Sequence, residues 1–279
     1  MRGPLGADED ISPDEMLKIA KELKGFVSEV GYVKKINEGT FDLRYYSSER
    51  EVDFCGHATI AIMYDLIKNS CDLMKKERVH IITRKGKLSV ENRIDAEDAV
   101  FITAPDPIFS SVEISPAHIA KALKINLDEI ETGAACSPAI VNAGLETLIV
   151  PVKHLDAMLS MSPEFDELKE FCVKNSIDII TAYSNEVADQ KNRCRVRVFV
   201  PVFGYLEDPA TGSGNSALGH YLLKNNLWDG AFMALEQNQS RENPNIIKLM
   251  AKKDSDSGKS RVIFGGGAIA KIDGEYILQ

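Results

Sequence analysis

A glycine-containing loop between a β-rich stretch and a helix constrains the fold more than any other segment. Residues 206–214 read Leu-Glu-Asp-Pro-Ala-Thr-Gly-Ser-Gly and follow the β-rich stretch 194–203. Glycine permits tight turns and close approach to a ligand, and Thr211, Ser213 and Asn215 are residue types that cap helices. A helix start exposes unpaired N–H groups and a positive dipole end. The loop therefore predicts either a plain capped turn or a site for a carboxylate or phosphate.

A second segment in the first half has the same layout. A β-like stretch at 41–46 leads through a polar loop into Phe54-Cys55-Gly56-His57-Ala58-Thr59 and an apolar helix. The two segments share layout more than letters. We expect a duplicated α/β architecture in which both helix starts face one cleft.

Composition narrows the class of protein. The 279 residues are 44% hydrophobic, enough for one or two cores, and two domains are expected. The net charge of −9 and the lack of a Lys/Arg-rich block argue against nucleic acid as a partner. No apolar run approaches the roughly 20 residues of a membrane span, and no signal segment opens the chain.

The cysteines indicate a reducing compartment. There are five, they are scattered, and neither a Cys-x-x-Cys pair nor a His-rich cluster occurs. We therefore expect no disulfide framework, no metal site and a cytoplasmic location.

Periodicity and capping residues place the elements. The first helix begins at Ser12-Pro13-Asp14-Glu15, with serine as cap, proline at the first position and acids in the first turn. Further helices are expected over 58–68, 116–123 and 163–175. Strands are expected over 27–34, 41–46, 79–83, 87–91, 99–103, 141–152, 177–183, 195–203, 246–251, 261–264 and 268–272. The Pro105–Pro107 punctuation sets the expected domains at 1–110 and 111–279, and whether the last strand crosses back to the first domain stays open.

Both motifs together resemble the PhzF-like phenazine-biosynthesis family, which has the diaminopimelate-epimerase fold. The first motif, 54–59, resembles the family's glycine-histidine motif, and 207–213 resembles its second. Matches also lie at 19–33, 142–150 and 265–268. The resemblance implies an α+β fold: two similar domains, each a curved mixed sheet around a central helix, with a cleft between them. It also implies a homodimer.

Two departures from the family pattern occur. The chain opens with Arg2-Gly3-Pro4-Leu5-Gly6 and reaches Ser12 almost at once. The family's opening strand and Gly-Asn-Pro segment is therefore either absent or partly missing from this sequence, and no binding residue is assigned there. The family's Gln-Gly and Gly-Arg-Pro-Ser run appears as the altered sequence 237–245.

The resemblance makes Glu29 the expected general acid/base, because it lies in the Ser28-Glu29 motif. Without the resemblance, the favoured interpretation of Glu29 is a surface glutamate on the edge of a strand. His57 and Asp208 are expected to hold and polarise a substrate, although each also suits a structural role at a helix start. Backbone groups at Gly56, Gly212 and Ser213 complete the expected substrate-binding set.

Cys55 separates two reaction classes. Diaminopimelate epimerase and proline racemase, relatives by fold, use one cysteine in each motif. Cys55 occupies the first position, but Thr211 stands at the second, and its hydroxyl is too weak an acid or base to replace a thiolate.

Three functions stay open. The leading hypothesis, implied by the resemblance, is a PhzF-like isomerase that moves protons on a small carboxylate-bearing metabolite in a biosynthetic process, with no metal and no cofactor. The alternatives are an amino-acid racemase or epimerase using Cys55, and a non-catalytic small-molecule-binding homodimer.

Overall fold

The computed structural model describes residues 11–27, 29–134, 136–253 and 260–278. The chain divides into two compact units. Unit 1 comprises Met1–Ile102 and Gly265–Gln279, and unit 2 comprises Thr103–Phe264. Ser28 of the Ser28-Glu29 motif and the residues before Ile11 lie outside the described ones.

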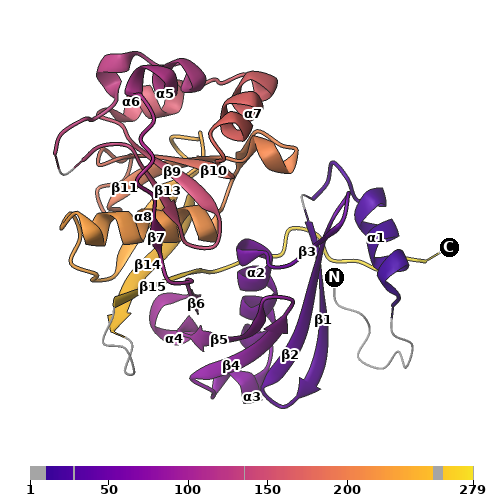
Figure 1. The fold of residues 1–279 in the computed structure, drawn as a ribbon. Coiled ribbons are helices and arrows are strands. Elements are labelled where there is room, and N and C mark those ends of the chain that lie inside the picture. Colours follow the sequence, from indigo (N-terminus) through magenta and orange to yellow (C-terminus); the bar gives the residue numbers. More distant parts are fainter. Residues whose placement is uncertain (1–10, 28, 135, 254–259, 279) are drawn as a thin grey trace. The chain divides into compact units, whose positions relative to one another are not determined.

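Unit 1 contains a mixed sheet ordered β1-β2-β4-β5-β6, with β3 beside β2 (Figure 1). Strands β2 and β4 are parallel, and the other pairs are antiparallel. The strands are β1 (Glu29–Asn37), β2 (Thr40–Ser47), β3 (Glu51–Val52), β4 (Arg78–Thr83), β5 (Gly86–Asn92) and β6 (Val100–Thr103). The helices are α1 (Pro13–Glu22), α2 (Gly56–Lys68), α3 (Cys71–Met74) and α4 (Ile94–Glu97).

Alternation along β1 assigns a helix to each face of this sheet. Val30 and Tyr32 pack in one buried cluster with Ile19 of α1. Gly31 faces the opposite way, where a Cβ atom would lie only 2.5 Å from Ile62 Cδ1 of α2. A glycine at this position therefore lets α2 pack closely on the strand.

Helix α1 begins with a capping box. The backbone N–H of Glu15 donates to Ser12 Oγ at 3.3 Å, and the backbone N–H of Ser12 donates to Glu15 Oε2 at 2.8 Å. The helix start expected from the sequence is confirmed.

In unit 2 the strand order is β15-β14-β13-β11-β10-β9-β8-β7, with β12 beside β11. The pairs β9/β10 and β11/β13 are parallel. The strands are β7 (Ile108–Phe109), β8 (Ala139–Asn142), β9 (Glu146–Pro151), β10 (Ile179–Ser184), β11 (Cys194–Phe199), β12 (Glu207–Asp208), β13 (Met233–Gln237), β14 (Asn245–Lys253) and β15 (Ser260–Gly266). The helices are α5 (Pro116–Leu123), α6 (Leu155–Ser160), α7 (Phe165–Lys174) and α8 (Gly212–Lys224), and short 3-10 turns lie at Leu127–Glu129 and Pro201–Phe203.

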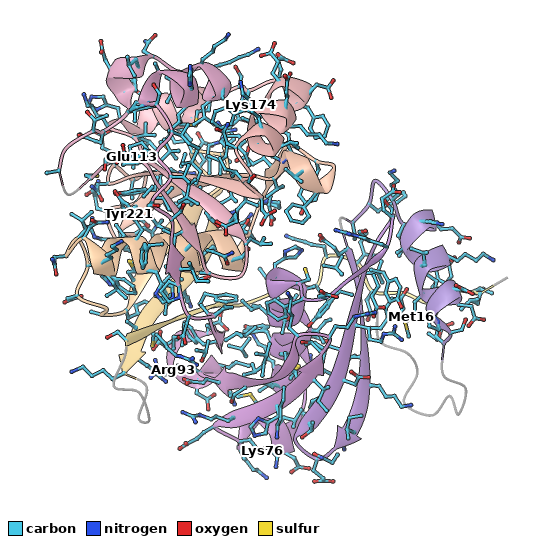
Figure 2. All side chains as sticks on the ribbon, in the orientation of Figure 1. Met16, Lys76, Arg93, Glu113, Lys174 and Tyr221 are labelled. Atoms are coloured by element: carbon cyan, nitrogen blue, oxygen red, sulfur yellow. The ribbon has the colours of Figure 1, made fainter. Side chains whose placement is uncertain are left out.

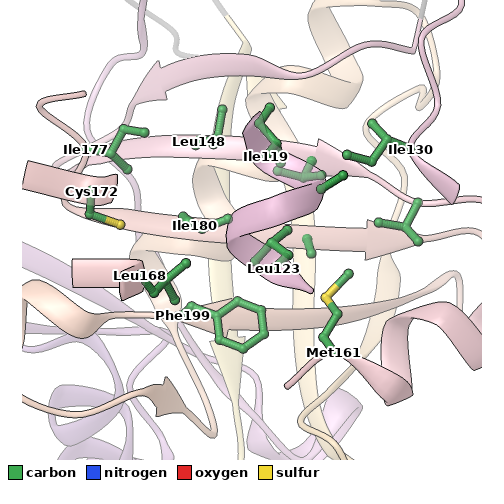
Figure 3. Close-up of a cluster of buried hydrophobic side chains, with 14 of the residues drawn as sticks. Ile119, Leu123, Ile130, Leu148, Met161, Leu168, Cys172, Ile177, Ile180 and Phe199 are labelled. Atoms are coloured by element: carbon green, nitrogen blue, oxygen red, sulfur yellow. The ribbon is translucent and has the colours of Figure 1, made fainter. Parts of the chain in front are cut away.

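Helices cover both faces of the sheet in unit 2 (Figure 1). Ile180 lies in the buried cluster with Leu123 of α5 and Leu168 of α7 (Figure 3). Its neighbour Thr181 faces the other way, toward Gly214 of α8. Helix α8 is almost completely buried, as expected of a helix around which a sheet wraps.

The hydroxyl of Tyr221 fixes α8 to the segment before β8. It accepts a hydrogen bond from the backbone N–H of Ser137 at 3.0 Å and donates to the carbonyl of Ser137 at 2.9 Å. Figure 2 shows the labelled Tyr221 among the side chains that fill this part of unit 2.

Several elements differ from expectation. The expected strand 268–272 is wrong, because these residues form no regular structure and Ile269 and Ile272 are largely exposed. The expected strand 195–203 ends at Phe199, because Pro201 starts a 3-10 turn. Helix α6 and strand β13 were not expected. Among the described residues, the structure contains no helix long and apolar enough to cross a membrane.

The expected domain boundary followed residue 110, whereas the two units meet between Ile102 and Thr103. Strand β7 belongs to unit 2, where its residues Ile108 and Phe109 pair with β8. The C-terminal segment from Gly265 returns to unit 1.

Candidate functional site

Glu29 begins β1, opposite Ser47 of β2. Its side chain is only 11% exposed, and its Oε2 lies 3.1 Å from Nε2 of His57. The surface-glutamate interpretation does not hold, because this carboxylate is largely buried and hydrogen-bonded to a second candidate residue.

His57 lies in the first turn of α2, directly after the cap residue Cys55 and Gly56. Cys55 is buried, and its Sγ lies 3.6 Å from Nε2 and 3.7 Å from Nδ1 of His57. Donor atoms of Glu29, Cys55 and His57 all lie within 4.8 Å of one another. Sulfur, nitrogen and oxygen donors thus meet where α2 begins.

Hydroxyl groups fix the start of α2 from the sheet side. The hydroxyl of Thr59 donates to the carbonyl of Cys55 at 2.6 Å, and the hydroxyl of Tyr45 contacts Thr59 Oγ1. Because the Thr59 proton is used in the bond to the Cys55 carbonyl, the Tyr45 hydroxyl donates to Thr59 Oγ1. Burial raises the pKa of Tyr45. Both residues are buried, and this chain of hydrogen bonds holds the Cys55 backbone in place.

Two arginines form hydrogen bonds with Glu51 of β3, the strand that precedes the first motif. Glu51 accepts two hydrogen bonds from Arg44, at 2.7 and 2.9 Å, and one from Arg84 at 2.7 Å. The hydrogen bonds from Arg44 hold the pKa of Glu51 below its ordinary value. Glu51 therefore stays anionic and ties the loop before Cys55 to β2.

The second motif in unit 2 has a different arrangement. Asp208 is buried at the end of β12, and its Oδ1 accepts a hydrogen bond from the backbone N–H of Ala210 at 3.1 Å. Thr211 is the cap residue of α8, but its side chain makes no capping hydrogen bond. Gly212 and Ser213 occupy the first turn, where backbone N–H groups have no acceptor within the helix.

Gln237 at the end of β13 fixes this loop. Its Oε1 accepts from the backbone N–H of Thr211 at 3.1 Å and from Asn215 Nδ2 at 2.6 Å. Its Nε2 donates to the carbonyl of Asp208 at 2.7 Å and to Thr211 Oγ1 at 3.1 Å. Sequence reasoning noted 237–245 as an altered loop but missed this function of Gln237.

A surface depression of about 500 Å³ lies beside the second motif. Its lining is Glu207, Pro209, Asn238, Gln239 and Ser240. Asp208 is not part of it, because neighbouring residues of a strand point to opposite sides. The depression therefore adds nothing to the candidate chemistry of Asp208 or of the α8 start.

The structure brings Glu29, His57 and Cys55 together in unit 1, and Asp208, Thr211, Gly212 and Ser213 together in unit 2. The cleft expected between the two domains depends on the arrangement of the units and stays a prediction.

The fold belongs to the diaminopimelate epimerase-like class. A PhzF family protein of Bacillus anthracis has a similar solved structure, with a TM-score of 0.80 and 24% identity over 92% of this chain and 86% of that one. A hydroxyproline epimerase of Agrobacterium vitis has a TM-score of 0.52 and 13% identity, covering 86% of this chain and 71% of that one. The α+β fold class expected from the sequence is confirmed.

The model of the family described as phenazine biosynthesis-like proteins matches residues 5–274, and the chain belongs to this family. An uncharacterized isomerase of Clostridium acetobutylicum is 27% identical over 95% of this chain and 88% of its own length. An uncharacterized isomerase of Bacillus subtilis is 28% identical over 77% of this chain and 72% of its own length. These names agree with the expected enzyme class, an isomerase of unidentified substrate. Homodimerisation, cytoplasmic location and a biosynthetic role stay predictions.

Proposed function

We propose that this protein is a cofactor-independent isomerase that moves a proton on a small carboxylate-bearing metabolite. The observation that carries the proposal is the hydrogen bond between the largely buried Glu29 carboxylate and His57 at the start of α2. A carboxylate held in this way suits general acid/base work, since its geometry is fixed and few waters compete for it.

The proposed reaction uses Glu29 in both directions. The Glu29 carboxylate takes a proton from a carbon of the substrate. The electron pair of the broken C–H bond then delocalises toward the substrate's own carboxylate, which is conjugated with that carbon. Glu29 then returns the proton to another carbon, so the reaction is an isomerisation with no net redox change. His57 and the first N–H groups of α2 stabilise the negative charge that develops.

The second motif supports a binding role. Asp208 is proposed to accept a hydrogen bond from a substrate amine or hydroxyl, and backbone N–H groups at Gly212 and Ser213 to bind a carboxylate. The rigid hydrogen bonding around Gln237 and Thr211 keeps this loop in one conformation.

The racemase alternative needs a second acid/base in unit 2. Burial raises the pKa of Cys172 to about 12 and that of Cys194 to about 12, so both thiols stay protonated near neutral pH. Thr211 Oγ1 is already hydrogen-bonded to Gln237. These observations argue against Cys172, Cys194 and Thr211 as the second acid/base. The third thiol of unit 2, Cys136, is partly buried and lies 3.2 Å from the hydroxyl of Tyr183.

Deuterium exchange tests the proposal without a known product. A panel of small unsaturated carboxylates and amino acids is incubated with the protein in D₂O, and incorporation at carbon is followed by NMR. Glu29→Gln should slow exchange by about 10²-fold or more. Glu49→Gln is the matched control, because Glu49 is exposed and contacts only the exposed Lys24 in its ion pair.

Cys55→Ala distinguishes the alternatives. Exchange that persists in this variant supports the Glu29 reaction, whereas exchange at an amino-acid α-carbon that disappears favours the racemase. Binding of a carboxylate with no exchange by the unmodified protein would instead indicate the non-catalytic homodimer. Sedimentation of the intact protein tests the proposed dimer, and a monomer would remove it.

A further inference from the structure

Three side chains of unit 1 bring the donor atoms of a transition-metal site together. Cys55 Sγ lies 3.6 Å from His57 Nε2, and His57 Nε2 lies 3.1 Å from Glu29 Oε2. All three donor atoms lie within 4.8 Å of one another. They come from the start of β1 and the start of α2. Glu29 and His57 also form the hydrogen bond on which the proposed function depends.

These separations fit tetrahedral zinc. Bond lengths of about 2.3 Å to sulfur and about 2.0–2.2 Å to nitrogen and oxygen place neighbouring ligand atoms about 3.4–3.6 Å apart. The observed sulfur–nitrogen and nitrogen–oxygen distances of 3.6 and 3.1 Å differ from these values by a few tenths of an ångström at most. The third separation, between Cys55 Sγ and the Glu29 carboxylate, is at most 4.8 Å. Side-chain rotation therefore has to close a gap of up to about 1.2 Å to reach the tetrahedral value.

The imidazole has room for the movement it needs. Cys55 Sγ is almost equally far from both ring nitrogens, so the ring must turn to direct one nitrogen toward a shared ion. The side chain of His57 is 34% exposed, which permits that rotation. Cys55 and Glu29 are more buried and supply the fixed side of the site.

We propose that Glu29, Cys55 and His57 form a binding site for a thiophilic divalent cation such as Zn²⁺ or Co²⁺. Thiolate and imidazole favour zinc-like ions over Mg²⁺ and Ca²⁺, which prefer oxygen ligands. Thiolate and carboxylate bind as anions, so they neutralise a divalent charge beside the positive end of α2. Binding releases the thiol proton of Cys55 to solvent.

A bound ion and proton transfer by Glu29 exclude each other, because both use the same carboxylate oxygen and the same imidazole. Metal binding is nevertheless a separate property of the chain. Its test measures binding alone, so the site and the proposed isomerase reaction succeed or fail independently.

Cobalt provides the direct readout. Tag-free protein is treated with a chelator, desalted and titrated with Co²⁺ while its absorption spectrum is recorded. The expected result is saturation at an equimolar amount, with a thiolate-to-cobalt charge-transfer band and the strong visible bands of tetrahedral cobalt. Added Zn²⁺ should bleach both, whereas a large excess of Mg²⁺ should not. No charge-transfer band in the unmodified protein, or displacement by Mg²⁺, overturns the proposal.

Variants assign the ligands. Cys55→Ser should abolish the charge-transfer band, and Glu29→Gln should weaken Co²⁺ binding by about tenfold or more, the size of loss seen when a metal site is perturbed. Cys71→Ser is the matched control, because Cys71 is an exposed free cysteine of the same unit. A band that survives Cys55→Ser but disappears in Cys71→Ser contradicts the assignment. Circular dichroism verifies that each variant is folded. If a variant misfolds, the presence or absence of the charge-transfer band in the unmodified protein decides whether the proposed site exists.

Discussion

Gln237 and Thr211 exchange two hydrogen bonds across unit 2. The backbone N–H of Thr211 donates to Gln237 Oε1, and Gln237 Nε2 donates to Thr211 Oγ1, both at 3.1 Å. Gln237 is fully buried, and every hydrogen-bonding atom of its amide has a partner in the second motif or α8. One strand residue thus determines the conformation of the loop expected to bind substrate.

Gln237→Glu tests that function. The substitution keeps the shape but replaces the donor Nε2 by an acceptor facing the carbonyl of Asp208, and it buries a charge. We expect the free energy of unfolding to fall by about 3 kcal/mol. Denaturation followed by the fluorescence of Trp228, the single tryptophan and part of unit 2, measures this.

Gln239→Glu is the control for this change. Gln239 is exposed and makes one long hydrogen bond, of 3.3 Å, to the carbonyl of Leu159. A loss within about 0.5 kcal/mol is expected there. Equal losses in the two variants would contradict the function assigned to Gln237.

The first helix could be predicted from the sequence, and the Gln237 interaction could not. Ser12 and Glu15 lie three positions apart, so local capping chemistry determines α1. Strand β13 contains the buried polar residues Glu236 and Gln237, whose side chains are paired with distant residues. Such residues look exposed in a sequence, and periodicity therefore missed the strand.

The candidate site divides in the same way. The helix starts at Gly56 and Gly212 could be predicted from the glycine-containing loops, although the cap residues Cys55 and Thr211 make no side-chain capping hydrogen bond. Glu29 could be assigned only through the family resemblance, because its burial depends on how β1 lies against α2. The sequence did not predict that Glu29 and Cys55 lie together, because the two residues are far apart in the chain and their spacing does not match a known metal-site motif.

A fully buried ion pair supports the strand that carries Gln237. Arg195 and Glu236 are 0% exposed, with 3.0 Å between Nη2 and Oε2. Glu236→Gln should lower the free energy of unfolding by about 3–5 kcal/mol, because the Arg195 cation stays buried without its counter-charge. Chemical denaturation at neutral pH provides the measurement. Glu164→Gln, which removes an exposed pair with Lys124, should cost less than about 1 kcal/mol.

The same pair predicts an acid dependence. Burial pushes the pKa of Glu236 upward, but hydrogen bonds from Ala188, Asn192 and Asp189 and the charge of Arg195 outweigh it and hold the pKa below 4.5. Its stabilisation is therefore complete above the unfolded pKa and is lost as pH falls through the folded one. A Glu236→Gln penalty that did not shrink in acid would contradict this ionisation.

Gly212 permits close contact between α8 and β15. A Cβ atom there would lie 2.2 Å from Cε2 of Phe264, well inside van der Waals contact. Gly212→Ala should destabilise unit 2 by about 1–3 kcal/mol, although alanine normally favours helices. Gly133→Ala is the control, because a Cβ there meets nothing within 4 Å. A Gly212→Ala protein as stable as the control would show that the ring can move aside.

His220 on α8 predicts a separate acid sensitivity. It is 3% exposed, and among the described residues its Nε2 has no hydrogen-bond partner. Burial lowers its pKa to about 4, with Arg261 acting in the same direction and the Asp106 carboxylate and Pro105 carbonyl opposing it. The folded protein therefore excludes a proton that the unfolded chain binds below its ordinary pKa of 6.5.

The stability that the neutral His220 contributes should therefore be fully present above pH 6.5 and should be lost as pH decreases from 6.5 to about 4. The His220 contribution to that slope is at most about 1.4 kcal/mol per pH unit. His220→Asn, which retains a donor where Nδ1 lies, should flatten the profile in this window relative to the unmodified protein. His118→Asn at an exposed helix position should leave the profile unchanged. NMR titration of the His220 ring supplies the direct check, and a pKa near 6.5 in the folded protein would contradict the buried, neutral imidazole.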